Sequence, residues 1–344
     1  MENKVTLEMI QEAREALKGI TELTPVVTSS RLGNNLYIKT ENLQKTGSFK
    51  IRGAFNKIRS LSPEEASRGV IACSAGNHAQ GVALSATRLG IKSVICMPDG
   101  APILKVEATR AYGAEVVLVP GVYDDAAREA ERLSKEKGYT FAHPFNDPYV
   151  IAGQGTLGLE ILEQVPDVEQ IVVPIGGGGL ISGVAVAVKS MRPNVKVIGV
   201  QASTVPSMFV SRRNGEITTV KDGATTVAAY MFNKIDTSLK TVALVSGGNV
   251  DITTLSRIIT KGLQKTGRMC QLSMKLQDKA GNLARLLSCV ADKGANVLDI
   301  AHEREDAKTE VNSCVVTLTL ETRNAAHIAE IREYLTQNGY RLID

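Results

Sequence analysis

Short runs of apolar, often β-branched residues alternate with helical patterns between residue 5 and about residue 263. Each run is apolar at consecutive positions, which is the pattern of a strand covered on both faces of a parallel sheet. The segments between the runs are long enough for crossover helices. The pattern therefore predicts an α/β domain with strands at residues 70–73, 93–97, 114–119, 170–175, 195–200 and 241–245.

Two helix starts carry local signals. Residues 1–20 are charged throughout and predict an amphipathic helix. Ser62 stands before Pro63, and Glu65 follows three residues after the serine, so this stretch predicts a helix with a capping box.

After Gly267 the period of the apolar positions changes. The pattern predicts strands at residues 269–276, 296–304, 310–321 and 340–343, and helices at residues 282–293 and 324–338. This βαββαβ order is the split unit of ferredoxin-like sandwiches. We therefore expect one domain over residues 1–267 and a smaller one over residues 268–344.

Composition agrees with two globular domains. The 344 residues are 43% hydrophobic and 22% charged, with a mean hydropathy of −0.02. The formal charge is only +4, and the aromatic residues are 8 Tyr and 6 Phe with no Trp. A nucleic-acid-binding surface is therefore not expected.

The chain begins without the apolar stretch and cleavage site of a signal peptide, and no window approaches the ~18 uninterrupted apolar residues of a membrane span. We expect a cytoplasmic protein without membrane association. The cysteines are odd in number and never form CxxC, so neither a disulfide framework nor a metal site is expected, and buried thiols are the simplest interpretation. They are Cys73, Cys96, Cys270, Cys289 and Cys314.

Three turns carry the candidate chemistry, and the first is a run of four glycines at residues 176–179. It ends a predicted strand and opens an apolar helix, so backbone amides can surround an anion such as phosphate. Its spacing matches neither a dinucleotide-binding nor a triphosphate-binding motif. The alternative is that these glycines only allow tight packing of strand and helix.

The second turn is Ser74-Ala75-Gly76-Asn77-His78-Ala79-Gln80-Gly81, again between a strand and a helix. The hydroxyl of Ser74 and the free amides of the helix start suit a small carboxylate. The alternative is that Ser74 and Asn77 are ordinary helix caps. His78 is either a general base or, as is more common for a lone histidine, structural.

The third turn contains Lys50 among apolar and small neighbours, with Arg52 close by. Such an environment can lower the pKa of the lysine and make it a nucleophilic amine. The alternative, which is the default for any lysine, is an ordinary surface residue, and only the other motifs raise the interest of Lys50.

Four motifs in a fixed order carry a specific resemblance. They resemble the pyridoxal-phosphate enzymes of fold type II, the tryptophan synthase β-like fold, and among them the threonine ammonia-lyases, also called threonine dehydratases. The motifs are Ser48-Phe49-Lys50-Ile51-Arg52-Gly53-Ala54, Ser74-Ala75-Gly76-Asn77-His78-Ala79-Gln80-Gly81, Gly176-Gly177-Gly178-Gly179 and Ser246-Gly247-Gly248-Asn249.

The resemblance implies a role for each motif. Lys50 would hold pyridoxal 5'-phosphate as a Schiff base and move the substrate α-proton, and Phe49 would pack beside the ring. Asn77 would hydrogen-bond the ring hydroxyl, and Ser246 would meet the pyridine nitrogen. The phosphate would be bound at Gly176, Gly177, Gly178, Gly179 and Leu180. The substrate carboxylate would lie against Ser74, Ala75, Gly76, Asn77 and His78.

The implied reaction is β-elimination and deamination of L-threonine, or of L-serine, to 2-oxobutanoate, or pyruvate, and ammonia. A neutral hydroxyl at Ser246 does not hold the pyridine nitrogen protonated, which favours elimination over transamination. The chain departs from the family near residues 225–235, where several dozen residues and an acidic Glu-Gly-Ala-Gly stretch are missing. Two alternatives therefore stay open, namely a catalytically impaired cofactor- or amino-acid-binding relative and a serine dehydratase or racemase.

The tail resembles an ACT domain, an amino-acid-sensing module. Its expected effector-binding turn is Asp278, Lys279, Ala280, Gly281, Asn282 and Leu283. A ferredoxin-like unit leaves one sheet face and an edge strand open, so we expect a homo-oligomer. Isoleucine and valine are the first effectors to consider, and the alternative is a tail that only dimerises.

Overall fold

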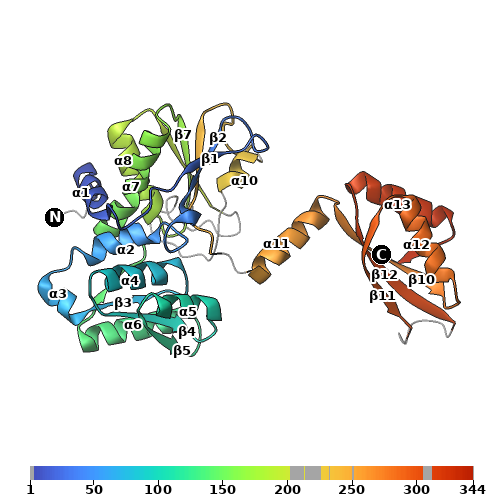
Figure 1. Cartoon of the computed structure of the whole chain (residues 1–344), viewed down its shortest axis with the longest axis horizontal. Coiled ribbons are helices and arrows are strands. Elements are labelled where there is room, and N and C mark those ends of the chain that lie inside the picture. The colour runs from blue at the N-terminus through green and yellow to red at the C-terminus, as the bar shows by residue number, and fades with distance from the viewer. Residues whose placement is uncertain are drawn as a thin grey trace. The chain divides into compact units, whose positions relative to one another are not determined.

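The structure is a computed structural model that describes residues 4–201, 213, 226–231, 233–249, 252–304 and 312–343. Contacts divide the chain into two compact units, Met1–Asn249 and Val250–Asp344 (Figure 1). Among the described residues, no helix has the length and apolar character needed to cross a membrane.

The larger sheet of the first unit has five strands. β1 runs antiparallel to β2, and all other neighbours in this sheet are parallel. Leu157 of helix α7 (Pro148–Gln164) and Val184 of helix α8 (Gly179–Met191) pack with Ile171 and Val242 of the central strands to form its core. In spatial order the strands are β1 (Val26–Thr28), β2 (Leu36–Thr40), β9 (Thr241–Val245), β7 (Gln170–Pro174) and β8 (Lys196–Val200).

The smaller sheet of the first unit is parallel throughout, and helices pack on both faces of its central part. Residues alternate in direction along its strands, so Ala72 packs with Val82 of helix α4 (Asn77–Arg88), while its neighbour Ile71 packs with Ala126 of helix α6 (Tyr123–Lys137). In spatial order the strands are β5 (Glu115–Val119), β4 (Ser93–Pro98), β3 (Val70–Cys73) and β6 (Thr140–Phe141).

The helices of this unit begin and end at the following residues. They are α1 (Leu7–Leu17), α2 (Lys50–Ile58), α3 (Pro63–Arg68), α4 (Asn77–Arg88), α5 (Ile103–Ala111), α6 (Tyr123–Lys137), α7 (Pro148–Gln164), α8 (Gly179–Met191) and α10 (Thr226–Met231), with a short 3-10 turn η1 (Glu41–Leu43). The predicted capping box at the start of α3 is confirmed, because the Ser62 hydroxyl accepts from the Glu65 amide and the Glu65 carboxylate accepts from the Ser62 amide.

All six strands predicted for this unit are present, and their ends differ from the prediction by at most one residue. The expectation that each strand is covered on both faces is wrong for β5 and β8, whose first and fourth residues are exposed. Both are edge strands, so one side of each lacks a neighbour. The apolar runs also did not indicate that the strands form two sheets, or that β1, β2 and β6 exist.

The second unit contains a four-stranded antiparallel sheet, and two helices connect its strands along the chain. Its βαββαβ order is confirmed, and every predicted element is present. The chain order is α11 (Ile252–Lys265), β10 (Met269–Gln277), α12 (Asn282–Asp292), β11 (Asn296–Glu303), β12 (Ser313–Glu321), α13 (Ala325–Gln337) and β13 (Arg341–Ile343), and the spatial order of the strands is β11-β12-β10-β13. The start predicted for β12, at residue 310, lies outside the described residues.

All five cysteines are free thiols. Cys73, Cys96 and Cys314 are buried as predicted, whereas Cys270 and Cys289 are partly exposed. Burial raises the pKa of the Cys73 thiol to about 11 and that of Cys96 to about 12, so both are unreactive at neutral pH.

Helices α2 and α7 contact each other at Gly153 of α7. This contact sets how closely the helix that begins at Lys50 packs on the rest of the unit. A Cβ atom at Gly153 would lie 2.5 Å from the Arg52 carbonyl oxygen and 2.7 Å from the Gly53 Cα. No side chain fits there without moving one of the two helices.

Gly153→Ala should therefore lower the free energy of unfolding by about 1–3 kcal/mol, despite the better helix propensity of alanine. Urea denaturation followed by circular dichroism measures this change. Gly100→Ala is the matched control, because a Cβ atom there meets nothing within 4 Å, and its effect should stay within about 0.5 kcal/mol. Equal stability of the two variants would contradict the close packing of α2 on α7.

Candidate active site

The Lys50 motif and the Ser246 motif lie against each other although they are far apart in the sequence. Ser48 and Gly247 form an isolated antiparallel bridge, and the Phe49 amide donates to the Ser246 carbonyl oxygen over 3.1 Å. Ser246 directly follows β9, the strand that pairs with β2. The main chain therefore fixes the residue before Lys50 to the end of a central strand.

Asn249 connects these two motifs to the Asn77 turn. Its Nδ2 donates to the Thr46 carbonyl oxygen at 2.9 Å and to the Asn77 Oδ1 at 2.8 Å. Because the Asn77 oxygen is held in this way, the Nδ2 amide is the group that Asn77 offers to a ligand. Three of the four sequence motifs thus meet at one place.

Lys50 is the first residue of α2, and it is partly buried. The Nζ donates to the Pro144 carbonyl oxygen over 2.7 Å and lies 5.3 Å from the centre of the Phe49 ring. Burial lowers the pKa of Lys50 to about 8. A substantial fraction of the amine is therefore neutral near pH 8 and able to act as a nucleophile.

The sequence expectation that Arg52 assists this shift is wrong. The Arg52 guanidinium is engaged elsewhere, with its Nε 2.8 Å from a Glu41 oxygen and its Nη1 2.5 Å from a Glu160 oxygen. Burial acts to lower the pKa of Arg52, but the two carboxylates overcome it and raise that pKa. Arg52 is a buried structural cation, and burial alone accounts for the lowered pKa of Lys50.

His78 lies deep in the first unit and hydrogen-bonds to the Ala142 carbonyl oxygen, with its Nε2 at 2.8 Å. Burial and the nearby Lys50 amine lower the pKa of His78 to about 3. The ring is therefore neutral, so Nε2 carries the hydrogen and Nδ1 is an acceptor without a partner among the described residues. A histidine that is so difficult to protonate is a poor general base near neutral pH.

The Ser74 turn leaves the start of α4 open. Gly76 is the N-cap residue and provides no side chain, while the Ser74 hydroxyl accepts from the Gly76 amide at 3.2 Å. Asn77 is already the first helical residue, so neither Ser74 nor Asn77 caps the helix. The free amides of this helix start are suited to a carboxylate.

The glycine run lies between β7 and α8, and its members differ in their surroundings. Gly178 has a φ of +87°, which favours glycine, and a Cβ atom at Gly177 or Gly179 would collide with Phe145. The close-packing interpretation therefore accounts for those two positions. Gly176 faces open space, and the N-cap of α8 has no side chain, so the amides of this turn can receive a phosphate.

The loop from His143 to Phe145 was missed by the sequence analysis. It supplies the acceptor for Lys50, and the rings of His143 and Phe145 lie 4.7 Å apart in an edge-to-face arrangement. The His143 Nδ1 accepts from the Asn146 amide at 2.8 Å, and burial lowers the pKa of His143. A histidine and an aromatic residue flanking Pro144 just before the Asp147-Pro148 helix start were the available signal.

A family model described as "Pyridoxal-phosphate dependent enzyme" matches residues 17–258. The chain belongs to this family. Its residues also fit the cofactor, because an aldehyde requires an amine of lowered pKa such as Lys50, and a phosphate requires an open glycine turn at a helix start.

Comparisons with individual proteins of this pyridoxal-phosphate family place the chain beside threonine ammonia-lyases. The L-threonine ammonia-lyase of Thermotoga maritima is 45% identical over 397 residues, covering 98% of this chain and 99% of the relative. That of Geobacter sulfurreducens is 39% identical, with 98% of both chains covered.

A threonine deaminase from Solanum lycopersicum has a TM-score of 0.68 and 34% identity, covering 75% of this chain and 90% of that one. Maize serine racemase also has a TM-score of 0.68, with 31% identity, covering 76% of this chain and 98% of that one.

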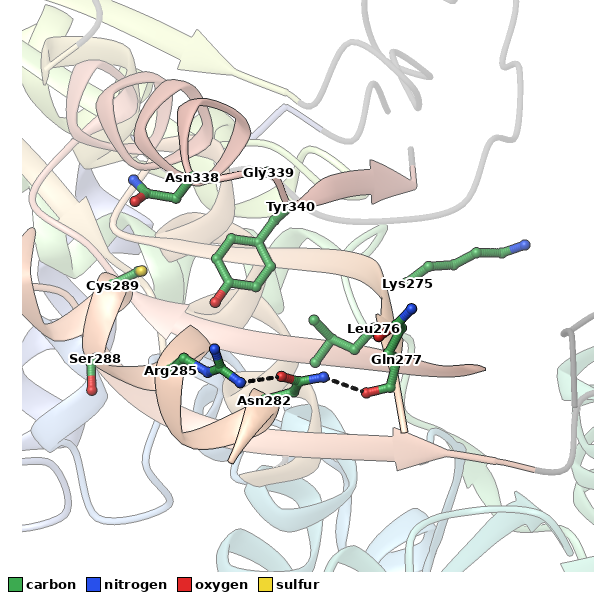
Figure 2. A pocket seen from close by; sticks show the side chains of 10 residues that line it. All are labelled: Lys275, Leu276, Gln277, Asn282, Arg285, Ser288, Cys289, Asn338, Gly339 and Tyr340. Atoms are coloured by element: carbon green, nitrogen blue, oxygen red, sulfur yellow. Dashed lines mark hydrogen bonds between the residues drawn. The ribbon is translucent and has the colours of Figure 1, made fainter. Parts of the chain in front are cut away.

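The turn expected to bind an effector connects β10 to α12 in the second unit. Gly281 is the N-cap of α12, with a φ of +87°, and Asn282 donates from Nδ2 to the Gln277 carbonyl oxygen at 2.9 Å. A cavity of about 580 Å³ lies beside this turn (Figure 2). Asn282 is the one residue of the expected turn that lines it, together with Arg285 and Tyr340 among others.

The lowered pKa of Lys50 predicts a pH dependence of stability. The folded chain loses the proton near pH 8, whereas an unfolded lysine retains it to about 10.5, so the unfolded state binds more protons between these values. In cofactor-free protein, the free energy of unfolding of the native chain should rise relative to that of Lys50→Met as the pH increases above 8. Denaturant titrations of both proteins across this range measure the difference. A difference that stays constant with pH would contradict the lowered pKa.

Proposed function

We propose that residues 1–267 form a catalytic domain that deaminates L-threonine to 2-oxobutanoate and ammonia and acts on L-serine to give pyruvate. The meeting of the Lys50, Asn77 and Ser246 motifs around a partly buried amine of lowered pKa carries this proposal. The two relatives named L-threonine ammonia-lyase, each matched over 98% of this chain, support the choice of substrate.

Lys50 is the catalytic residue of the proposal. Bound pyridoxal phosphate supplies an aldehyde that captures amines and a ring that withdraws electrons from the substrate α-carbon. The Lys50 amine would hold the cofactor covalently and would remove the α-proton of the substrate. Its lowered pKa suits both tasks, since a neutral amine is the nucleophile and the proton acceptor. Phe49 would pack beside the cofactor ring.

Two helix starts hold the anionic groups in this proposal. Amides from Gly176 to Leu180, at the start of α8, bind the phosphate, and the turn from Ser74 to His78, at the start of α4, binds the substrate carboxylate. Helix dipoles favour negative charge at both places. Each anion therefore has a backbone site of its own, and the reacting carbon is held between them.

The cofactor ring is oriented by two side chains. The Nδ2 of Asn77 donates to the ring hydroxyl, because the Asn77 oxygen is occupied by Asn249. The Ser246 hydroxyl meets the pyridine nitrogen at the end of β9, the edge where ligands of open α/β sheets bind. A hydroxyl does not hold this nitrogen protonated, so loss of the β-hydroxyl is favoured over transamination.

We further propose that the catalytic domain is shortened near residues 225–235. The match to the Thermotoga maritima protein extends over 397 residues, which is more than the 344 of this chain. A match to an Escherichia coli catabolic threonine dehydratase extends over 315 residues, more than the 74% of this chain that it covers. This difference supports the proposal that the residues present in the relatives and missing from this chain belong to the catalytic part. This observation favours a second candidate function, a relative that holds cofactor or amino acid without turnover.

Residues 268–344 are proposed as an ACT domain that binds an amino-acid effector at the turn from Asp278 to Leu283. The βαββαβ topology supports this assignment. β11 is an edge strand, and its Leu298 and Ile300 are exposed, as is Ile343 of the opposite edge strand β13. Open edges and exposed apolar residues favour pairing with a second copy, so the proposal includes a homo-oligomer.

Borohydride reduction of the cofactor-loaded protein, followed by peptide mapping, tests the catalytic assignment. We expect the pyridoxyl label on Lys50, and we expect Lys50→Ala to abolish formation of 2-oxobutanoate from threonine. Lys57→Ala, on the same helix, serves as the control and should retain activity. A label on another lysine would contradict the site, whereas a label on Lys50 without product would support the binding protein instead.

Calorimetric titration of the full chain with isoleucine and with valine tests the effector proposal. We expect one of them to bind, and we expect Asn282→Ala to weaken it about tenfold, the loss typical of one or two hydrogen bonds. Asn296→Ala, on β11 and away from the turn, should bind as the native chain does. If neither amino acid binds while the protein remains oligomeric, the tail has only the pairing role.

A further inference from the structure

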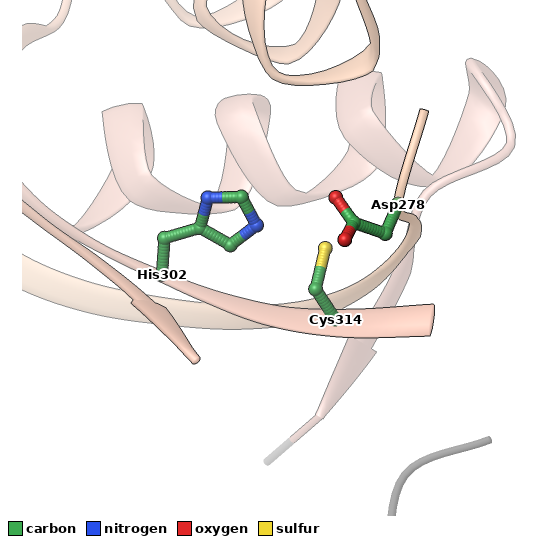
Figure 3. A group of neighbouring side chains, drawn as sticks. All are labelled: Asp278, His302 and Cys314. Atoms are coloured by element: carbon green, nitrogen blue, oxygen red, sulfur yellow. The ribbon is translucent and has the colours of Figure 1, made fainter. Parts of the chain in front are cut away.

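Three side chains with metal-binding donors converge in the second unit. Asp278 follows the end of β10, His302 lies on β11 and Cys314 lies on β12, and their donor atoms all fall within 4.8 Å of one another (Figure 3). They come from three separate elements and are 24 and 12 residues apart in the sequence. No residue of this group takes part in the proposed reaction.

The register of the sheet explains how they meet. Cys314 pairs with Leu276 of β10, two residues before Asp278, and His302 pairs with Val316, two residues after Cys314. Because residues two apart on a strand face the same side, His302 and Cys314 point to the same face of the sheet. Asp278 completes the group from the loop that leaves β10.

His302, one member of this group, has a buried nitrogen, Nε2, without a hydrogen-bond partner among the described residues. A buried polar atom left unsatisfied costs about 1–3 kcal/mol, so its persistence at this place calls for a ligand. The Cys314 thiol donates to the Leu276 carbonyl oxygen over a long 3.6 Å, a weak contact that a metal would readily replace.

We propose that Asp278, His302 and Cys314 bind a zinc ion through a carboxylate oxygen, an imidazole nitrogen and the sulfur. A thiolate with an imidazole selects zinc over magnesium or calcium, which prefer oxygen ligands only. Three protein ligands leave one tetrahedral position for water or another small donor. The thiol proton is released to solvent when the sulfur binds the metal.

To bind zinc, the three donor atoms need to move only slightly closer together. With zinc bonds of ~2.0–2.3 Å, the donors of a tetrahedral site lie roughly 3.3–3.8 Å apart, which is about 1.0–1.5 Å less than the 4.8 Å within which the three donors now lie. Asp278 is exposed and currently forms an ion pair with Arg304, with 3.0 Å between the carboxylate oxygen and Nε. Zinc would compete with this guanidinium for the carboxylate.

The sequence predicts no metal site, because no CxxC or similar spacing is present. That rule detects ligands that are close in sequence, whereas these three are brought together by strand pairing. The proposed site stands apart from the proposed catalytic function, so either can fail without the other. It does share Asp278 with the turn in which we expect the effector.

Equilibrium dialysis of the full chain against zinc chloride, followed by metal quantification, tests the proposal. We expect one zinc ion per chain to be retained by the native protein and by Cys289→Ser, the control thiol of the same unit. Cys314→Ser and His302→Gln should each weaken binding at least about 100-fold, since the loss of a direct ligand costs no less than the loss of an outer partner. Circular dichroism of each variant reports whether it is folded.

Two further variants change exposed side chains and therefore leave the core of the second unit intact. Asp278→Asn, at an exposed position, should also weaken zinc binding, and Arg304→Gln should tighten it severalfold because the competing guanidinium is gone. Absence of stoichiometric zinc in the native chain would overturn the proposal. Equal zinc affinity in the native chain and the folded Cys314→Ser or Asp278→Asn variants would overturn it as well.

Discussion

The buried ion pairs of Arg52 with Glu41 and Glu160 are the interaction on which the candidate active site depends. They join the Lys50 helix to η1 and to α7 in the interior of the first unit. Glu160 also accepts from Lys39 of β2 at 2.6 Å, so two buried cations face two buried carboxylates. Removing one partner of such a group leaves a charge without compensation, which typically costs ~3–5 kcal/mol. The network therefore holds the start of α2 in one position.

Lys39 and Lys50 differ in whether a carboxylate opposes the effect of burial on the pKa of the amine. Burial lowers the pKa of both amines, but for Lys39 the nearby Glu160 opposes the shift. Lys50 has a carbonyl oxygen as its partner and no carboxylate among the causes of its shift, so burial acts unopposed. The same helix thus places a compensated cation at Arg52 and an uncompensated amine at Lys50. A fixed, partly neutral amine is the chemical feature that pyridoxal-phosphate enzymes need from the protein.

Local patterns predicted the elements well, and contacts between distant segments were the part that they missed. Six strands of the first unit, the capping box before α3 and the βαββαβ tail follow from periodicity and turn residues within short windows, whereas β1, β2 and β6 do not. The pairing of Arg52 with Glu160 was not predictable, because it joins residues 108 apart in the sequence. Phe145 was missed for the same reason, since its role against Gly177 appears only when the two loops meet.

A shortened catalytic domain is compatible with this architecture because the proposed shortening lies in the connection between β8 and β9. β8 is an edge strand, and β9 stands on the far side of β7, so the chain must cross from the edge to the centre of the sheet after Val200. A parallel crossover needs only a dozen or more residues, and Thr241 begins β9 well beyond that length. The sheet and the position of Ser246 therefore tolerate the loss of residues here. In such a shortened domain, the elements that carry Lys50, Asn77 and Ser246 would keep their connections.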